Sequence, residues 1–278
     1  MLTRLQGFIL ETHIWLGISA VVCTWGTFVL LDQPVPVRYL LFVLSATIWV
    51  YTFHGYKNGK DCDTQSGPGT LSTRLKKIFI VVGFISSIVL FFMLDRIVQT
   101  LMLVPAFLAI SYTLPWYNGR RLKDIPFVKI IAVVVSWTLV TYGIPIQKID
   151  HWWSESGYGL LMLDRLFFFL ALAIPFDIRD IEYDQNHDLA TIPNTIGVEN
   201  SQFLALFSVF LAAGFMALGF DHLDLPDSIR LGVLSVYILI GIVVIHLKHH
   251  PPKIYYSWLI DGFLLLYGLS ILLLTDNL

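Results

Sequence analysis

The sequence predicts an all-α integral membrane protein, a bundle of nine transmembrane helices that forms a single transmembrane domain over residues 1–278. Three observations favour this fold class. Hydrophobic residues make up 56% of the chain and charged residues 14%, against about 45–50% and about 25% in soluble proteins. The mean hydropathy is +0.72. Nine apolar runs are long enough for helices that cross a bilayer.

The expected helices lie, in order, at residues 14–31, 35–53, 78–94, 97–114, 125–146, 158–176, 203–220, 231–247 and 255–274. Each run has about the 20 residues that a span requires, and a more polar segment separates it from the next. Aromatic side chains at the ends of the runs suit the headgroup level of a membrane: Trp116, Trp152, Trp153, Tyr255, Tyr256 and Trp258. No small-residue cleavage site follows the segment up to Glu11, so we expect it to belong to the first helix rather than to a cleaved signal.

Basic residues predict the orientation, because cytoplasmic loops carry the excess of Lys and Arg. One side of the expected bundle carries Arg4, Lys57, Lys60, Arg74, Lys76, Lys77, Arg120, Arg121, Lys123, Arg179, Lys248 and Lys253, and the other only Arg38, Arg96, Lys148 and Arg230. The N-terminus is therefore expected in the cytoplasm and the C-terminus outside, which in a bacterium means the inner membrane. Helices one to four and five to eight place the two longest cytoplasmic loops equivalently, which suggests a pseudo-repeat.

Charge and cysteine content exclude several function classes. The formal net charge is −2, so nothing favours nucleic acid as a partner. Cys23 lies in an apolar run and Cys62 in a polar loop, which argues against a disulfide scaffold or a structural zinc site. Glycine-rich phosphate loops and serine or cysteine nucleophile motifs are absent from the sequence.

The most informative feature is a row of acids after the sixth apolar run. Asp177, Asp180, Asp184 and Asp188 are spaced three, four and four residues apart, which on one continuous helix places them within roughly an 80° arc. Like charges at these spacings repel one another, so a positive group is expected beside them. Oxygen ligands of this kind suit Mg²⁺ together with phosphate oxygens. The alternative is a solvated acidic helix end.

Two segments carry a resemblance to a known family. Residues 179–197 read Arg-Asp-Ile-Glu-Tyr-Asp-Gln-Asn-His-Asp-Leu-Ala-Thr-Ile-Pro-Asn-Thr-Ile-Gly, which resembles the second aspartate motif of the UbiA superfamily of intramembrane prenyltransferases. Residues 112–123 read Tyr-Thr-Leu-Pro-Trp-Tyr-Asn-Gly-Arg-Arg-Leu-Lys, which resembles that family's tyrosine-then-basic segment. Nine helices with both loops on the cytoplasmic side also suit the family.

The resemblance implies an enzyme that binds an isoprenoid diphosphate through Mg²⁺, ionises its C–O bond and lets a small acceptor, aromatic or other, attack the prenyl cation. It implies that Asp180, Asp184 and Asp188 bind Mg²⁺, that Asp180 and Asp184 are catalytic, and that Asp177 lines the substrate site. Candidates for diphosphate binding are Arg120, Arg121 and Lys123, and Tyr112 is the candidate for the pocket wall. The alternative for the basic trio is ordinary anchoring on the cytoplasmic side.

The first aspartate motif departs from the family pattern. The spacing of that motif places His54, Lys57 and Asp61 where the family has three aspartates. We expect His54 to bind substrate, Asp61 to bind metal, and Lys57 to act in catalysis as a point charge on the diphosphate. A register shift would bring Lys60 or Asp63 into the motif instead, and a loss of chemistry at this site is a further alternative.

Charged residues within the expected spans include Asp164, Arg165 and Asp261. Asp261 faces either the pocket or a structural hydrogen-bond partner, since charges inside a bilayer require one or the other. Asp164 and Arg165 are nearer the outer side, where packing or pairing accounts for them.

The sequence leaves several functions open beside the prenyltransferase. One is a terpene-cyclase-like variant that folds the prenyl chain onto itself. Another is a non-catalytic homologue that binds a prenyl lipid or acts as a scaffold, which the replacement of acids by His54 and Lys57 favours. A transporter or channel is the third, although Pro175 has no counterpart in the second expected helix.

Overall fold

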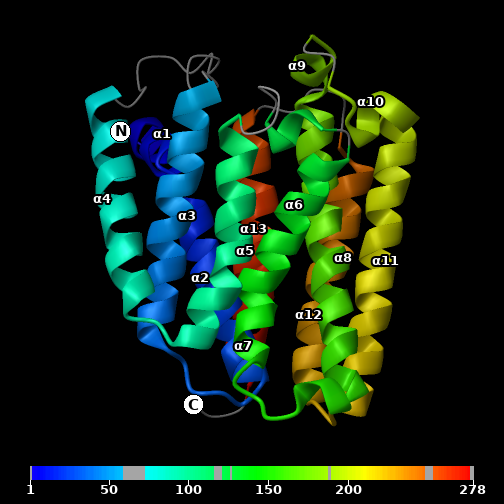
Figure 1. The fold of residues 1–278 in the computed structure, drawn as a ribbon. Coiled ribbons are helices and arrows are strands. Elements are labelled where there is room, and N and C mark those ends of the chain that lie inside the picture. Colours follow the sequence, from blue (N-terminus) through cyan, green and yellow to red (C-terminus); the bar gives the residue numbers. More distant parts are fainter. Residues whose placement is uncertain are drawn as a thin grey trace.

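The computed structural model of the chain is an all-helical bundle whose long helices run side by side between two ends (Figure 1). It describes residues 2–58, 73–115, 121–125, 127–186, 189–247 and 253–275. Within these ranges, eight helices are long and apolar enough to cross a membrane, and one further apolar helix, Ile14–Leu30, is shorter. The prediction of an all-α integral membrane protein is confirmed, and each expected helix has its counterpart.

The long helices of the first half are α2 (Ile14–Leu30), α3 (Val37–Asn58), α4 (Thr73–Phe92) and α5 (Arg96–Thr113). In the second half, α6 (Val128–Thr138) continues through a π-helical stretch, η3 (Leu139–Gly143), into α7 (Ile144–Ile146), and the remaining long helices are α8 (Ser156–Arg179), α11 (Val198–His222), α12 (Asp227–Ile245) and α13 (Lys253–Leu274). Several helices extend beyond their apolar runs, as in α4, where the polar first turn is also helical.

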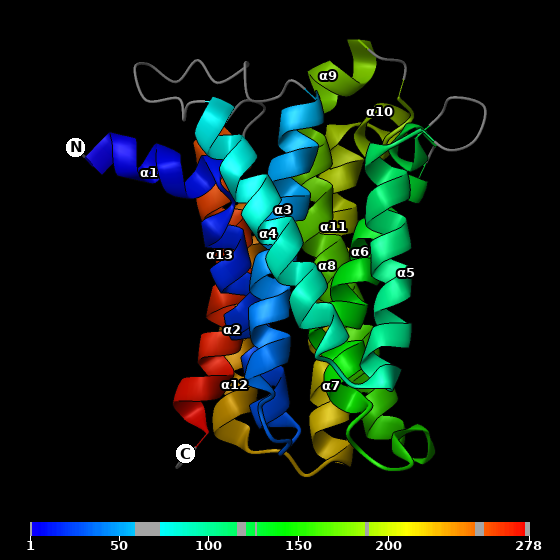
Figure 2. The same cartoon turned by 60° about the vertical axis from the view of Figure 1, so that its left-hand side comes forward.

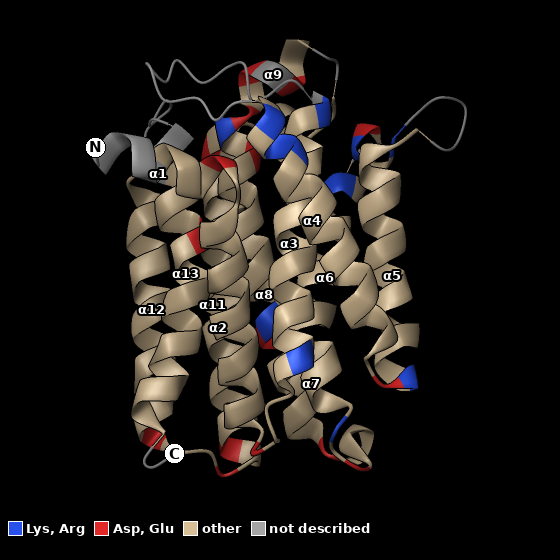
Figure 3. Ribbon diagram, turned by 90° about the vertical axis from the view of Figure 1, so that its left-hand side faces the viewer, with Lys and Arg blue, Asp and Glu red and all other residues tan. Residues whose placement is uncertain are grey.

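Short helices lie at the two ends of the bundle. Four of them share one end, called the α9 end below: α1 (Leu2–Glu11), η2 (Leu122–Asp124), α9 (Ile181–Asn186) and α10 (Ile192–Ile196). At the opposite end lies η4 (Trp152–Ser154). Figure 3 shows that Lys, Arg, Asp and Glu gather at these two ends, while the middle of the bundle is almost free of them in the coloured part of the chain.

The start of the chain differs from the expectation. Residues up to Glu11 form α1, a helix separate from α2, because His13 adopts a left-handed conformation with φ 55° that interrupts the helix. Figure 2 shows α1 lying across the end of the bundle rather than along it. Two contacts attach α1 to α4: the Phe8 and Phe79 rings, whose centroids are 5.7 Å apart, and the Glu11 carboxylate, 3.2 Å from Lys76 Nζ.

The helices pack in close pairs, with α8 along α11, α2 along α13, and α3 along α4. The α2–α13 pair crosses at two glycines, Gly26 and Gly268. A Cβ atom on Gly268 would lie 2.2 Å from the carbonyl oxygen of Val22, and one on Gly26 would lie 2.9 Å from the carbonyl oxygen of Gly268. Small residues that let two backbones touch are a common basis of helix association in membranes. Contact at these glycines therefore places α13 beside α2.

A buried polar cluster joins four helices in the middle of the bundle. The Asp164 carboxylate accepts hydrogen bonds from the hydroxyls of Tyr237 and Tyr267. The Arg165 guanidinium lies 4.2 Å above the Tyr267 ring, and its Nη1 is 3.1 Å from Cys23 Sγ. Charges at this depth require such partners. These contacts agree with the expectation that Asp164 and Arg165 serve packing and pairing.

The close approach at Gly268 gives a stability prediction. We expect Gly268→Ala to lower the free energy of unfolding by about 1–3 kcal/mol, because the added methyl group would overlap the α2 backbone. Gly214→Ala in α11 is the matched control, since a Cβ there would have no atom within 4 Å. Thermal unfolding in detergent checks this. A Gly268→Ala variant as stable as the Gly214→Ala variant would contradict the described packing of α2 on α13.

The turn at His13 predicts a pH dependence. Burial, and then the charges of Lys76 and Arg179, lower the pKa of His13 to about 4 from its ordinary 6.5. Between these two values the unfolded chain binds a proton that the folded chain does not, so His13 reduces stability as the pH falls from 7 toward 4. Asn tolerates left-handed backbone, so we expect His13→Asn to show a smaller loss of melting temperature than the unmodified chain between pH 7.5 and pH 5. Equal losses would contradict the burial of a neutral His13.

Candidate functional site

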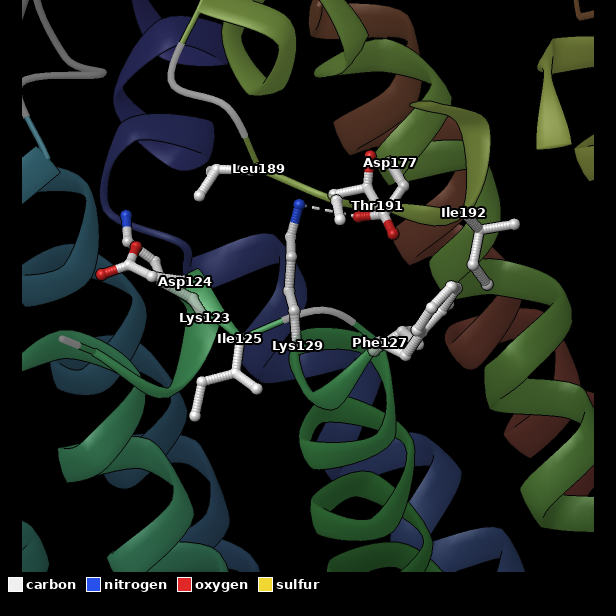
Figure 4. Close-up of a pocket in the computed structure, with 11 residues that line it drawn as sticks. Lys123, Asp124, Ile125, Phe127, Lys129, Asp177, Leu189, Thr191 and Ile192 are labelled. Atoms are coloured by element: carbon white, nitrogen blue, oxygen red, sulfur yellow. Dashed lines mark ion pairs between the residues drawn. The ribbon is translucent and has the colours of Figure 1, made fainter. Parts of the chain in front are cut away.

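The candidate site lies at the α9 end, where three segments of the chain meet. They are the last turn of α8, the segment from η2 to the first turn of α6, and the segment 189–192 that leads into α10. Figure 4 shows side chains from these segments around one pocket. The acidic and basic residues that the sequence placed on separate loops thus come together in space.

The acidic row does not share one helix face. Helix α8 ends at Arg179, and Asp180 caps it with non-helical backbone angles before α9 begins at Ile181. The Asp180 carboxylate turns back onto the neighbouring guanidinium, with its oxygens 2.9 and 3.1 Å from Arg179 Nε and Nη2. The expected continuous stripe is therefore divided at Asp180. Asp188 lies outside the described residues.

Asp177 and Asp184 nevertheless converge, on Lys129 near the start of α6. Lys129 Nζ lies 2.8 Å from Asp177 Oδ1 and 3.2 Å from Asp184 Oδ2, and Figure 4 shows its side chain extending toward Asp177. Both carboxylates are buried. The spacing of the acids predicts a positive group beside them, and in this structure that group is an ammonium of the chain itself.

Lys129 was not among the residues that the sequence singled out. The signal that could have found it is its position one turn from the start of an apolar run, since a charge that enters the bilayer region requires a partner. What the sequence does not show is which partner, because Lys129 is far along the chain from Asp177 and Asp184 and meets them through the packing of α6 on α8.

The pocket beside Lys129 is small. Lys123, Asp177, Leu189 and Thr191 are among its lining residues, and its volume of ≈ 10 Å³ corresponds to about one water molecule. Thr191 is 5% exposed, and its Oγ1 has no hydrogen-bond partner in the described part of the chain. A buried hydroxyl without a partner is unfavourable unless a water or ligand satisfies it.

The basic segment contributes one residue to this pocket. Lys123 is buried and lines it. Arg121 instead binds Asp124, with Nε 3.0 Å from Oδ2 and Nη2 3.0 Å from Oδ1. Burial alone would raise the pKa of Asp124, but the hydrogen bonds from Arg121, with the charges of Arg121 and Lys123, lower it below its ordinary value. Arg120, the third member of the predicted trio, lies outside the described residues.

The first motif reaches the site through Tyr112. The ring centroids of His54 and Tyr112 are 4.8 Å apart, and His54 Nδ1 lies 3.3 Å from Thr113 Oγ1. Tyr112 in turn is within electrostatic range of Lys129, Asp177 and Asp184. Lys57 is exposed in the last turn of α3. Asp61, together with the alternatives Lys60 and Asp63, lies outside the described residues.

Asp261, left open by the sequence, lies in α13 within electrostatic range of Arg179. The Arg179 guanidinium is 4.9 Å from the centre of the Phe176 ring and 5.9 Å from that of Tyr256. The charge of Arg179 therefore acts on Asp261 from the last turn of α8.

The described carboxylates do not fit a divalent cation in this arrangement. Among the residues that the structure describes, no group of three or more His, Cys, Asp or Glu side chains could hold a metal ion. Asp177 and Asp184 face an ammonium, and both oxygens of Asp180 face a guanidinium. Mg²⁺ requires oxygen ligands, and here basic groups of the chain already occupy them.

Comparisons with known proteins gave structural matches only. No family model and no curated protein matches the sequence. The structure of a UbiA homologue from Archaeoglobus fulgidus bound to GPP and Mg²⁺ matches with TM-score 0.66 and 14% identity, over 96% of this chain and 99% of that one. The apo structure of a UbiA homologue from Aeropyrum pernix K1 matches with TM-score 0.68 and 12% identity, over 92% and 97%. A digeranylgeranylglyceryl phosphate synthase matches with TM-score 0.62 and 14% identity, over 99% of both chains.

The chain thus has the UbiA fold over nearly its full length. This confirms, at the level of the fold, the resemblance that residues 112–123 and 179–197 indicated. The low identity with all three structures explains why similarity is detectable in the arrangement of the helices and not in the sequence as a whole.

The ion triad of Lys129, Asp177 and Asp184 gives a stability prediction. We expect Lys129→Met to lower the free energy of unfolding by about 3–5 kcal/mol, because it leaves two buried carboxylates without their counter-charge. Lys148→Met, which removes the ammonium of an exposed pair with Asp95 at the other end, should change stability little. Thermal unfolding of both variants in detergent is the measurement. Equal, small effects would show that the triad is solvated and not buried.

Proposed function

We propose that this protein is an intramembrane prenyltransferase of the UbiA type, which ionises an isoprenoid diphosphate and transfers the prenyl group to an aromatic or other small acceptor. The observation that carries the proposal is the shared fold with the Archaeoglobus fulgidus homologue bound to GPP and Mg²⁺, over 96% of this chain. The charged pocket at the α9 end supports it, because the segments that resemble the family's motifs meet there.

The reaction requires charge stabilisation at one end of the substrate. The bond between the allylic carbon and the diphosphate oxygen breaks, and its electron pair leaves with the diphosphate. The acceptor then forms a bond to that carbon and loses a proton. Cationic side chains placed where negative charge develops lower the barrier to such a departure. Lys123 and Lys129, which both line the pocket, are placed for this role.

The reaction also requires a dry environment for the prenyl cation. Trp137 lies eight residues beyond Lys129 along α6, about 12 Å deeper in the bundle. Its Nε1 donates a hydrogen bond to Tyr51 Oη at 2.9 Å, and its ring stacks on Phe169 with centroids 5.8 Å apart. Aromatic faces attract cations. This aromatic group suits the interior that would receive the prenyl tail.

We place the α9 end, and with it the N-terminus, in the cytoplasm. The excess of basic residues on the loops at this end supports the assignment. The diphosphate and the acceptor would then enter from the cytoplasmic side, while the prenyl tail lies at the depth of the lipid.

A second candidate is a non-catalytic homologue that binds a prenyl lipid. The observation that favours it is the loss of acids at His54 and Lys57, together with the pairing of Asp177 and Asp184 by Lys129. Such a protein would bind isoprenoid diphosphates without releasing diphosphate from them.

The test is incubation of the purified protein with isoprenoid diphosphates of increasing chain length, with and without aromatic acceptors. Diphosphate release and mass spectrometry of the products are measured. The proposal expects release with a prenylated acceptor as product. Release with a cyclic hydrocarbon would indicate a cyclase-like variant. Binding without release would favour the lipid-binding homologue. The proposal would be contradicted if the protein did not bind the diphosphates and did not release diphosphate from them.

Within this assay we expect Asp184→Asn to reduce the rate of release by about 10²-fold, the scale seen when a group that organises charge stabilisation is removed. Asp184 holds the Lys129 ammonium in place, and the amide removes the charge that does so. Asp95→Asn is the matched control, because it also alters an Asp–Lys pair, but an exposed one at the opposite end. Equal rates of diphosphate release for the two variants would show that Asp184 does not contribute to the reaction.

A further inference from the structure

We propose that Lys129 is a built-in substitute for a divalent cation at the acidic pair formed by Asp177 and Asp184. The ammonium bridges the two carboxylates and contacts a phosphate oxygen of the ligand, so that this pair binds no free divalent cation. The identity of the ligand as an isoprenoid diphosphate rests on the proposed function, whereas the occupation of the acidic pair does not.

The Lys129 ammonium lies between the two carboxylates, where a divalent cation would otherwise bind. Lys129 Nζ lies 2.8 Å from an Asp177 oxygen and 3.2 Å from an Asp184 oxygen, so one positive centre joins carboxylates from α8 and α9. The three side chains are 16%, 7% and 2% exposed. A divalent cation at this point would have to displace the lysine from both carboxylates.

The Lys129 ammonium has one more hydrogen-bond donor than its two carboxylate partners use. An ammonium has three N–H groups, and the two contacts with Asp177 and Asp184 use two of them. One donor is left for a ligand. The same three-way connection, two carboxylates and one phosphate oxygen, is what a bridging metal ion provides, and Lys is a well-known phosphate binder.

The Thr191 hydroxyl provides a second donor on the lining of the same pocket. Thr191 Oγ1 is buried and has no hydrogen-bond partner among the described residues, and Thr191 lines the same pocket as Lys129 and Lys123. The space there has a volume of ≈ 10 Å³, which admits a group about the size of a water molecule. A phosphate oxygen is of that size, and it would accept hydrogen bonds from the hydroxyl and the ammonium together.

The first aspartate motif also has fewer acids in this chain than the family pattern has. The residues that align with its acids include His54 and Lys57, so this side of the site is also less acidic and more basic than the family pattern. A chain that keeps one of three carboxylates there, Asp61, and that pairs two acids of the second segment with its own lysine, is suited to hold a phosphate group with fewer metal ions.

The decisive experiment is a Mn²⁺ titration of the purified full chain without substrate, followed by electron paramagnetic resonance. Mn²⁺ here stands in for Mg²⁺. We expect the unmodified chain and Asp184→Asn to bind the same number of Mn²⁺ ions. We expect Lys129→Met to gain one ion, and Lys129→Met/Asp184→Asn to lose it again. Lys148→Met is the control: it breaks an ion pair with one carboxylate, that of Asp95, and should gain no ion.

Either of two results would overturn the proposal. One is Mn²⁺ binding by the unmodified chain that Asp184→Asn abolishes, because the acidic pair would then be a metal site despite Lys129. The other is a folded Lys129→Met variant that gains no ion. If Lys129→Met does not fold, the comparison of the unmodified chain with Asp184→Asn still decides between the two accounts.

A second arm measures the binding of inorganic pyrophosphate in the presence of EDTA. We expect the unmodified chain and Lys129→Arg to bind it, Lys129→Met to bind at least 10-fold more weakly, and Thr191→Val to be weakened several-fold. Binding that occurs only with a divalent cation would contradict the proposal. Neither arm uses an isoprenoid, so the two proposals can fail separately. If both arms gave the expected results but no prenyl transfer occurred, the proposed function would be wrong and the role of Lys129 would still be supported.

Discussion

The constraint on which this structure depends is that a charge within a membrane bundle must find a partner. The bundle meets it in different ways at two depths. In the middle, Asp164 is satisfied by two tyrosine hydroxyls and Arg165 by a thiol and an aromatic ring. At the α9 end, two carboxylates share one ammonium. Each arrangement has a buried polar atom without a hydrogen-bond partner among the described residues, Arg165 Nε in the first and Thr191 Oγ1 beside the second, but only Thr191 lines the pocket at the α9 end.

This difference separates a structural cluster from a candidate binding site. Burial and charge alone do not distinguish the two, since both contain nearly inaccessible acids. What distinguishes them is the pocket, because Lys129, with its third ammonium hydrogen, and Thr191, with its hydroxyl, both line it. A phosphate oxygen is suited to accept hydrogen bonds from both.

The π-helical stretch at Leu139–Gly143 continues the helix that carries Lys129. Within this stretch, the Val140 carbonyl accepts a hydrogen bond from Tyr39 Oη at 2.7 Å, which joins α3 to the continuation of α6.

The fold could be predicted from the sequence because the length of an apolar run is a local property that the bilayer thickness requires. The site could be predicted only in part. Asp177 and Lys123 line the same pocket, and Asp184 contacts Lys129 beside it, whereas the roles expected of these residues stay predictions. The even spacing of four aspartates gave a misleading picture of one stripe, because the helix ends where Arg179 and Asp180 pair with each other. Thr191 carries no signal in the sequence, and the position of Lys129 near the start of an apolar run does not show its partners, since the contacts of both residues join distant segments. The break at His13 was missed for a different reason: left-handed backbone is uncommon outside glycine, and although histidine is one of the residues enriched in it, a single histidine before an apolar run does not by itself indicate it.

The most direct test of the central claim, that the pocket beside Lys129 receives the phosphate end of an isoprenoid diphosphate, is an experimental structure of the chain in complex with geranyl diphosphate. The account predicts density for a phosphate group within hydrogen-bond distance of Lys129 Nζ and Thr191 Oγ1, with the prenyl tail extending into the bundle toward Trp137. Phosphate density elsewhere, or a tail directed away from the bundle, would contradict it.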